Sequence, residues 1–289
     1  MSYLRLVGEG FDAFLDDGAL SRGAAIAFYG VTAIAPTLYI AVTVASLGFG
    51  QDAARSAAFH YFSHLMSREN LEVLRLATRN APGSSTGILG GVIGVTTLVL
   101  TASGVFGEME DALNVIWRAP RKGSVLKRLL RGRAMSLVLV IGLGFLLLAS
   151  MSVTTAITVL GRYIDENTPF SVVALAAVNF AVATVLMTAT FAAIYKIVPN
   201  KDLEWHDVIV GAFGTALLFE VGQFLLGYYF GSTSMGAPYG AAGGLIVLLF
   251  WVYYSAQVFL LGAEFTKIYA CRFGSQQDAA CDSPMPQAA

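Results

Sequence analysis

One carboxylate lies in the middle of a long apolar stretch, where ionisable side chains are uncommon. Glu220 is the thirteenth residue of the stretch 208–230, and Gln223 follows it on the same side of a helix. Because an ionisable group inside a membrane is costly, such a residue is a candidate functional group. It could exchange a proton or bind a polar headgroup. Alternatively, Glu220 fixes the register of the helices through hydrogen bonds and does no chemistry.

Two other large amides fall within apolar stretches, Asn179 and Gln257. Polar side chains at membrane depth face the protein interior or a water-filled cavity. We therefore expect both amides to point into the bundle. Together with Glu220 and Gln223 they would line a polar cavity through which a headgroup could pass.

Other chemically capable side chains lack the partners that their chemistry needs. His60 and His64 are four residues apart, yet no third ligand follows at a recognisable spacing, so we expect no metal site. The sequence contains no phosphate-binding glycine loop, dinucleotide fingerprint, nucleophile elbow or zinc-protease motif. We expect no enzymatic activity and no cofactor, and no oligomeric state follows from the residues.

The elements that carry these residues are expected to be membrane-spanning helices. Charged residues make up 13% of the 289, about half the share of a soluble domain. Six apolar stretches each reach the roughly 20 residues that cross a bilayer, and together they contain one charge, Glu220. They are 24–48, 87–107, 134–160, 170–195, 208–230 and 241–263. The sequence predicts an all-α polytopic membrane protein with six transmembrane helices and excludes a soluble enzyme.

The charges of the loops predict the orientation. Lys and Arg number 13 in the alternate segments that include both termini and 5 in the others, so both termini are expected in the cytoplasm. Residues 1–23 then form a cytoplasmic amphipathic segment, and residues 24–270 form the transmembrane domain. Residues 271–289 are expected to be a disordered cytoplasmic tail.

Two segments between the spans are amphipathic. Residues 53–79 place Phe59 and Phe62 near helical spacing, which predicts a helix on the outer surface between spans one and two. The segment 118–133 either anchors the topology or attracts anionic headgroups, at about 1 kcal/mol per basic residue. Its basic residues are Arg118, Arg121, Lys122, Lys127, Arg128, Arg131 and Arg133. It has no interleaved aromatic residues, so we expect no nucleic-acid partner.

Proline and glycine interrupt the spans. Pro36, near the middle of span one, removes a backbone hydrogen bond and predicts a kink. Glycines near the start of spans two and six either let helices pack closely or permit them to move. These glycines are Gly90, Gly91, Gly94, Gly243 and Gly244.

An ordered series of short motifs runs through about residues 20–270. The series is Ala24-Ala-Ile-Ala-Phe28-Tyr29 before Pro36, Asp111-Ala-Leu-Asn114-Val-Ile-Trp117, Tyr195 with Pro199-Asn200, Trp205 ahead of Gly211 and Glu220, Tyr239-Gly240, and Gly262-Ala-Glu264. The series resembles the YihY/virulence factor BrkB family. One departure is that Ala33 and Ala35 stand where the family often has Ser and an aromatic residue.

The resemblance implies a multi-pass protein of the bacterial inner membrane. Some members of the family were labelled ribonuclease BN, and others are linked to serum resistance or envelope lipid traffic. Three scattered histidines cannot supply the ligand cluster of a metal-dependent tRNA nuclease, so we expect no ribonuclease. Two functions stay open. The protein transports or flips an envelope lipid, or a similar amphipathic molecule, through a cavity near Glu220, or it is a non-transporting, virulence-associated envelope scaffold.

Overall fold

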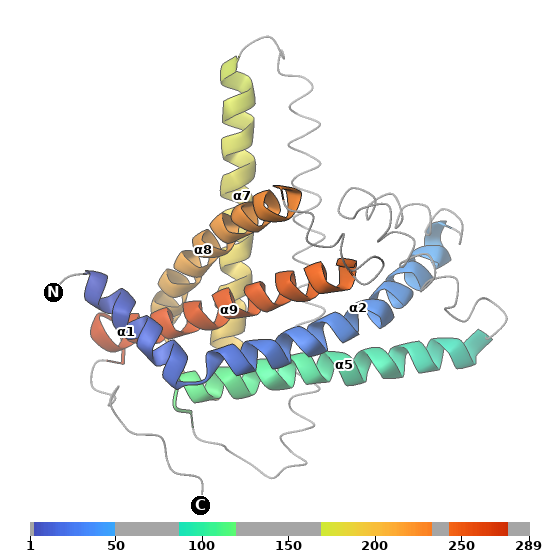
Figure 1. The fold of residues 1–289 in the computed structure, drawn as a ribbon, viewed down its shortest axis with the longest axis horizontal. Coiled ribbons are helices and arrows are strands. Elements are labelled where there is room, and N and C mark those ends of the chain that lie inside the picture. Colours follow the sequence, from blue (N-terminus) through green and yellow to red (C-terminus); the bar gives the residue numbers. More distant parts are fainter. Residues whose placement is uncertain (1–2, 50–86, 120–168, 233–242, 277–289) are drawn as a thin grey trace, which may run out of the picture. The chain divides into compact units, whose positions relative to one another are not determined.

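The computed structural model describes residues 3–49, 87–119, 169–232 and 243–276, and within these ranges the chain forms helices and short turns with no strand. The all-α class is therefore confirmed for the described residues. The helices are α1 (Tyr3–Asp16), α2 (Ala19–Phe49), α5 (Gly87–Ile116), α7 (Pro169–Ile197), α8 (Trp205–Ser232) and α9 (Gly243–Arg272) (Figure 1). The predicted span 134–160, the outer-surface helix 53–79 and residues 277–289 of the predicted tail lie outside the described residues.

Five predicted spans fall on described helices, but the helices extend beyond the apolar stretches. Helix α5 continues past residue 107 to Ile116, through Glu108 and Glu110, and α9 continues past residue 263 to Arg272. An apolar stretch ends where the hydrocarbon ends, whereas a helix ends where its last carbonyl groups find other partners. Of the described helices, α7, α8 and α9 contain stretches long and apolar enough to cross a membrane: Phe180–Ile197, Trp205–Tyr229 and Leu245–Arg272.

The N-terminal segment is a separate helix. Helix α1 ends at Asp16, and Gly18 takes a positive φ of 66°, a conformation that glycine adopts at little cost. Helix α2 then begins at Ala19, five residues before the predicted start of span one, and remains helical through Pro36.

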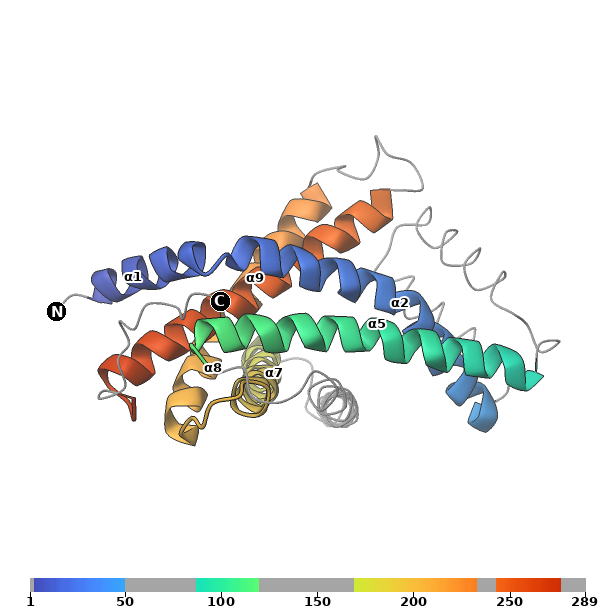
Figure 2. The ribbon, with the colours of Figure 1, turned by 90° about the horizontal axis from the view of Figure 1, so that it is seen from below.

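The chain divides into two compact units. One comprises residues 1–20, 109–223 and 257–289, and the other comprises residues 21–108 and 224–256. In the second unit α2 packs against α5 and α9 through glycines. A Cβ atom on Gly104 would lie 2.5 Å from Cδ1 of Tyr29, and one on Gly30 would lie 3.1 Å from Cγ1 of Val252. Both ribbon views show α2 alongside α5 (Figure 2).

In the first unit, α1 packs on the C-terminal part of α9. Gly10 lies against the ring of Phe265, where a Cβ atom would come within 2.7 Å of Cε1. An ion pair joins Glu9 on α1 to Arg272 at the end of α9. These contacts hold the end of α1, and the turn that contains Asp17, against α9.

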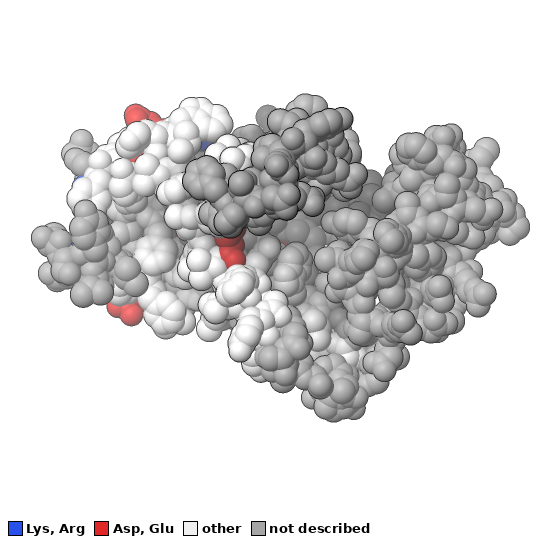
Figure 3. Space-filling view, turned by 90° about the horizontal axis from the view of Figure 1, so that it is seen from above, with Lys and Arg blue, Asp and Glu red and all other residues white. Residues whose placement is uncertain are grey.

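Much of the described surface is apolar. Figure 3 shows one face on which most described atoms belong to uncharged residues. On α8, Phe224 and Tyr228 are 75% and 73% exposed, and Val221 and Leu225 are also exposed. Exposed apolar side chains of this size at helical spacing suit contact with lipid rather than with water.

Candidate functional site

Helices α8 and α9 cross at two reciprocal glycine–threonine contacts. Gly211 on α8 lies against Thr266 on α9, and Gly262 on α9 lies against Thr215 on α8. Each threonine hydroxyl donates a hydrogen bond to the carbonyl of the glycine one turn earlier in its own helix, at 2.8 Å for Thr215 and 2.6 Å for Thr266. Small residues at such a crossing let two backbones approach closely in a membrane. This crossing fixes α8, the helix that carries Glu220.

Tyr195 joins α7 to the same crossing. Its side chain is fully buried, its hydroxyl donates a 2.6 Å hydrogen bond to the carbonyl of Phe259 on α9, and it lies 3.4 Å from Oγ1 of Thr215. The rings of Phe191 and Phe219 complete an aromatic cluster around it. Helices α7, α8 and α9 therefore share one close-packed junction.

Glu220 contacts a residue that the sequence did not single out, Thr184 on α7. The Thr184 hydroxyl oxygen lies 2.9 Å from Oε1 and 2.9 Å from Oε2 of Glu220. Both residues lie within apolar spans, about 13–15 residues from the turn between α7 and α8. At 1.5 Å per residue this is roughly 20 Å along the helices from the turn. Glu220 is half-buried and Thr184 is buried.

Glu220 can form a hydrogen bond with Thr184 whether its carboxyl group is charged or protonated. The single hydroxyl hydrogen of Thr184 has three acceptors at 2.9 Å, namely the two carboxylate oxygens and the carbonyl of Phe180. A charged Glu220 accepts from Thr184. A protonated Glu220 donates to Oγ1 of Thr184, which then donates to Phe180. Neither protonation state therefore leaves a hydrogen-bond donor of the pair without an acceptor.

Of the other residues of the predicted cavity, the structure describes the side chains of Gln257 and Gln223, and it describes no contact of either with Glu220. Gln257 donates a 3.3 Å hydrogen bond to the carbonyl of Leu20, and its Oε1 is buried with no hydrogen-bond partner among the described residues. Gln223 is half-buried on α8. Asn179 lies on α7, but its side chain is outside the described part of the structure. The described site is thus the pair Glu220–Thr184.

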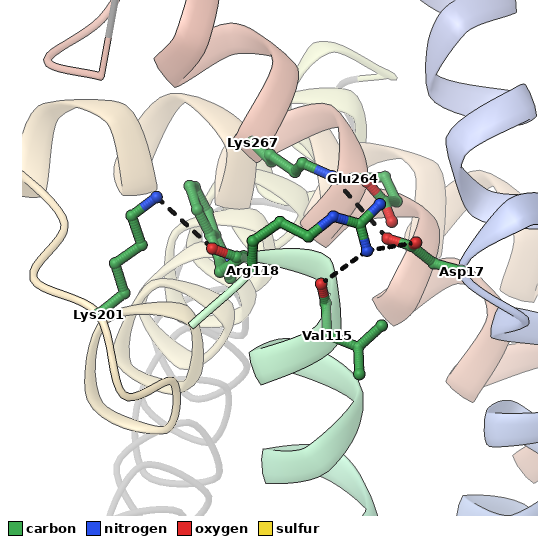
Figure 4. Close-up of polar contacts among 7 residues, drawn as sticks. Asp17, Val115, Arg118, Lys201, Glu264 and Lys267 are labelled. Atoms are coloured by element: carbon green, nitrogen blue, oxygen red, sulfur yellow. Dashed lines mark hydrogen bonds and ion pairs between the residues drawn. The ribbon is translucent and has the colours of Figure 1, made fainter. Parts of the chain in front are cut away.

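A second polar group, which we call the ionic cluster, consists of Asp17, Arg118, Glu264 and Lys267. Arg118 Nη1 lies 2.7 Å from Oδ1 of Asp17, and Lys267 Nζ lies 3.4 Å from Glu264 and 3.8 Å from Asp17. Figure 4 shows these side chains converging from the α1–α2 turn, the end of α5 and α9. Both carboxylates are buried. Glu264 and Lys267 are three residues apart on α9 and pair with each other, and Asp17 reaches Lys267 from the turn between α1 and α2.

Arg118 lies in a conformation that is unusual for its residue type. Its φ is 48°, and the amide of Ala119 donates to the carbonyl of Asn114 while the amide of Arg118 donates to that of Val115. This is the pattern that ends many helices with glycine in the left-handed position. Because a side chain there costs about 1–2 kcal/mol, the ion pair to Asp17 offsets strain in the backbone.

One asparagine and one lysine from the turn between α7 and α8 reach the end of α5. The Asn200 amide donates a 2.7 Å hydrogen bond to Asn114, and its side chain donates to Glu110 at 3.0 Å. Glu110 therefore accepts a hydrogen bond from the turn between α7 and α8. Lys201 Nζ lies 3.5 Å from the carbonyl of Trp117 and 5.8 Å from the centre of its ring.

Several motif residues that are distant in the chain therefore meet. Tyr195 lies at the junction of α7, α8 and α9, and Glu264 belongs to the ionic cluster. Asn114, Trp117 and Asn200 join the end of α5 to the turn between α7 and α8. Pro199 is buried beside them, whereas Phe28 and Asp111 are exposed.

The remaining predicted residues are only partly described. Arg118 is paired with Asp17, and the other six residues of the basic patch (Arg121, Lys122, Lys127, Arg128, Arg131 and Arg133) lie outside the described residues, as do Tyr239 and Gly240. Gly90, Gly91 and Gly94 lie on α5, and Gly243 and Gly244 begin α9. Gly243 is buried. The close glycine contacts that the structure does describe are at other positions, including Gly211 and Gly262.

Comparison with known proteins gives one family. The family model described as Virulence factor BrkB matches residues 11–285. The chain is 29% identical over 258 residues to a UPF0761 membrane protein of Rhodospirillum centenum, covering 88% of this chain and 54% of that protein. It is 28% identical over 256 residues to one of Ralstonia nicotianae, covering 86% and 55%, and 32% identical over 184 residues to one of Tolumonas auensis, covering 60% and 56%.

The chain spans about half the length of these curated relatives. No solved structure matches it.

Proposed function

The chain belongs to the virulence factor BrkB family and is a multi-pass integral membrane protein, and from this premise we propose that it transports or flips an envelope lipid or a similar amphipathic molecule. The polar headgroup would pass the hydrocarbon beside Glu220. The protein would act without an enzymatic step, a cofactor or a metal, and without a nucleic-acid partner.

The Glu220–Thr184 pair is the observation that supports this proposal. A polar headgroup meets its barrier in the hydrocarbon, and Glu220 places a carboxyl group within an apolar span, roughly 20 Å along the helix from the turn between α7 and α8. Thr184 can hydrogen-bond to this carboxyl group in both of its protonation states. The pair could therefore exchange a proton with a passing substrate or across the membrane, whereas a purely structural hydrogen bond has no need of a titratable group.

The proposal includes an arrangement in the membrane. We propose six spans in the bacterial inner membrane with both termini in the cytoplasm, which follows from the distribution of Lys and Arg. The basic segment 118–133 would then face anionic headgroups of the cytoplasmic leaflet. The turn between α7 and α8 would lie on the same side.

Complementation of a deletion strain tests the role of the carboxyl group. At equal expression, Glu220→Gln should lose function if proton exchange is required, because the amide keeps the size and polarity but does not titrate. Thr184→Val should reduce function, because it removes the hydroxyl that serves both states. Thr190→Val is the matched control, since within the described part of the chain the hydroxyl of Thr190, on the same helix, bonds to the carbonyl of Leu186 and to no carboxylate.

The outcome separates transport from a scaffold. Full function of Glu220→Gln would show that the mechanism does not need a titratable carboxyl group at this position. Full function of Glu220→Leu removes the polar path as well, and the protein would then be better described as an envelope scaffold.

A further inference from the structure

Lys201 adds a positive charge near the ionic cluster, whose carboxylates are already paired with other cations. In the ionic cluster Asp17 pairs with Arg118, and Glu264 pairs with Lys267. Lys201 is half-buried near this cluster, and among the described residues its partners are the carbonyl and the ring of Trp117, with no carboxylate. Figure 4 shows Arg118 and Lys267 directed toward Asp17, whereas Lys201 approaches the end of α5 from the turn between α7 and α8.

The pKa of the Lys201 ammonium group reflects the lack of a carboxylate partner in the described part of the chain. Burial lowers the pKa of the Lys201 ammonium group, and the positive charge of Lys267 lowers it further. Neither effect is opposed by a neighbouring acid among the described residues. An anion bound here would relieve the repulsion between the two ammonium groups.

Trp117, whose ring lies beneath Lys201, has a hydrogen-bond donor without an acceptor among the described residues. Its side chain is 1% exposed, and its Nε1–H is buried without an acceptor among the described residues. Buried donors are nearly always hydrogen-bonded, so an acceptor from outside the described residues is expected. Lys201 and Trp117 therefore both lack what an oxyanion would supply.

The depth of Lys201 in the membrane identifies the kind of anion. Lys201 lies four residues beyond the end of the span Phe180–Ile197 and four before the start of Trp205–Tyr229. A residue between two antiparallel spans lies at the level of the lipid headgroups, where the common anion is phosphate. We propose that Lys201, with Lys267 near it and Trp117 beneath it, forms a binding site for a phosphate group.

This site extends the proposed contact with anionic headgroups to a defined position, and it does not depend on transport. The phosphate group could belong to a lipid headgroup or to free phosphate. Three probes separate these sources: dioctanoyl phosphatidylglycerol, inorganic phosphate, and dioctanoylglycerol, which has the same acyl chains without phosphate.

The experiment measures the thermal stability of the purified full-length protein in detergent as each probe is titrated. Phosphatidylglycerol should stabilise the wild type and dioctanoylglycerol should not. Lys201→Gln should weaken binding about tenfold or more, because a charged hydrogen bond is lost, and Lys201→Arg should retain it. The matched control is Lys196→Gln, since Lys196 lies over the ring of Trp205 and binds the carbonyl of Leu203. If Lys201→Gln is unstable, Lys201→Met takes its place in the assay, because methionine keeps the apolar part of the side chain over Trp117.

The results distinguish a lipid headgroup from free phosphate as the ligand, and they can also contradict the proposed binding site. Stabilisation by both phosphate probes, lost in Lys201→Gln, supports a site for the phosphate group itself. Stabilisation by phosphatidylglycerol alone, lost in the same variant, supports a headgroup site. Equal affinity in Lys201→Gln and the wild type, equal stabilisation by dioctanoylglycerol, or no stabilisation by either phosphate probe would each overturn the proposal.

Discussion

Replacing Gly262 by alanine tests whether the crossing of α8 and α9 holds the helix that carries Glu220. A Cβ atom at this position would overlap the hydroxyl of Thr215 and would lie 2.6 Å from its Cγ2 and 2.7 Å from Oη of Tyr195. Neither neighbour can move freely, because Thr215 is bonded to the carbonyl of Gly211 and Tyr195 to that of Phe259. The helices must therefore separate, or a buried hydrogen bond must break.

The cost follows from these two effects. Overpacking of a well-packed interior costs about 1–3 kcal/mol, and a lost hydrogen bond between neutral groups adds about 1 kcal/mol. We expect Gly262→Ala to destabilise the protein by roughly 2–4 kcal/mol. For a chain of this length that lowers the apparent Tm by about 5–10 °C.

The assay is fluorescence-detected size-exclusion chromatography after heating, on protein in one detergent. The matched control is Gly214→Ala on α8, where a Cβ atom would have no neighbour within 4 Å, and which should be neutral or stabilising by up to about 1 kcal/mol. In the double variant Gly262→Ala/Thr215→Ala part of the stability should return, because the overlapping atoms of Thr215 are gone. A Tm for Gly262→Ala within 1 °C of the control would refute the close crossing.

Two further predictions concern Arg118 and the topology. Arg118→Gly should be more stable than Arg118→Ala by about 1 kcal/mol. Both variants lose the ion pair to Asp17, but only glycine adopts a φ of 48° without strain. Equal melting temperatures of the two variants would show that the backbone at this position is not strained. Alkaline phosphatase fused to the C-terminus should be inactive if that end is cytoplasmic. An active fusion would reverse the proposed orientation.

The helices could be predicted from the sequence because charge is excluded from hydrocarbon. The gaps between charged residues located α2, α5, α7, α8 and α9. Their ends could not be predicted in this way, since Glu264 and Lys267 remain helical beyond the apolar stretch of α9. The break at Gly18 depends on a single positive φ, and no pattern in the surrounding residues distinguishes it from a continuous helix.

The candidate site was predicted in part. Glu220 stood out because a carboxylate in an apolar span is rare. Its partner Thr184 did not, because threonines within membrane helices commonly bond to their own backbone, as Thr188 does to the carbonyl of Thr184.

The ionic cluster could not be predicted, because Asp17, Arg118 and Glu264 are more than 100 residues apart in sequence. Only the packing of α1, α5 and α9 brings them together.

The most direct test of lipid translocation is leaflet exchange of a fluorescent phospholipid in liposomes that contain the purified protein. We predict exchange above that of protein-free vesicles for the wild type, and a loss of most of this exchange in Glu220→Gln. Exchange equal to that of protein-free vesicles, or undiminished in Glu220→Gln, from protein that is folded by size-exclusion chromatography would contradict the proposed role of Glu220 in lipid passage.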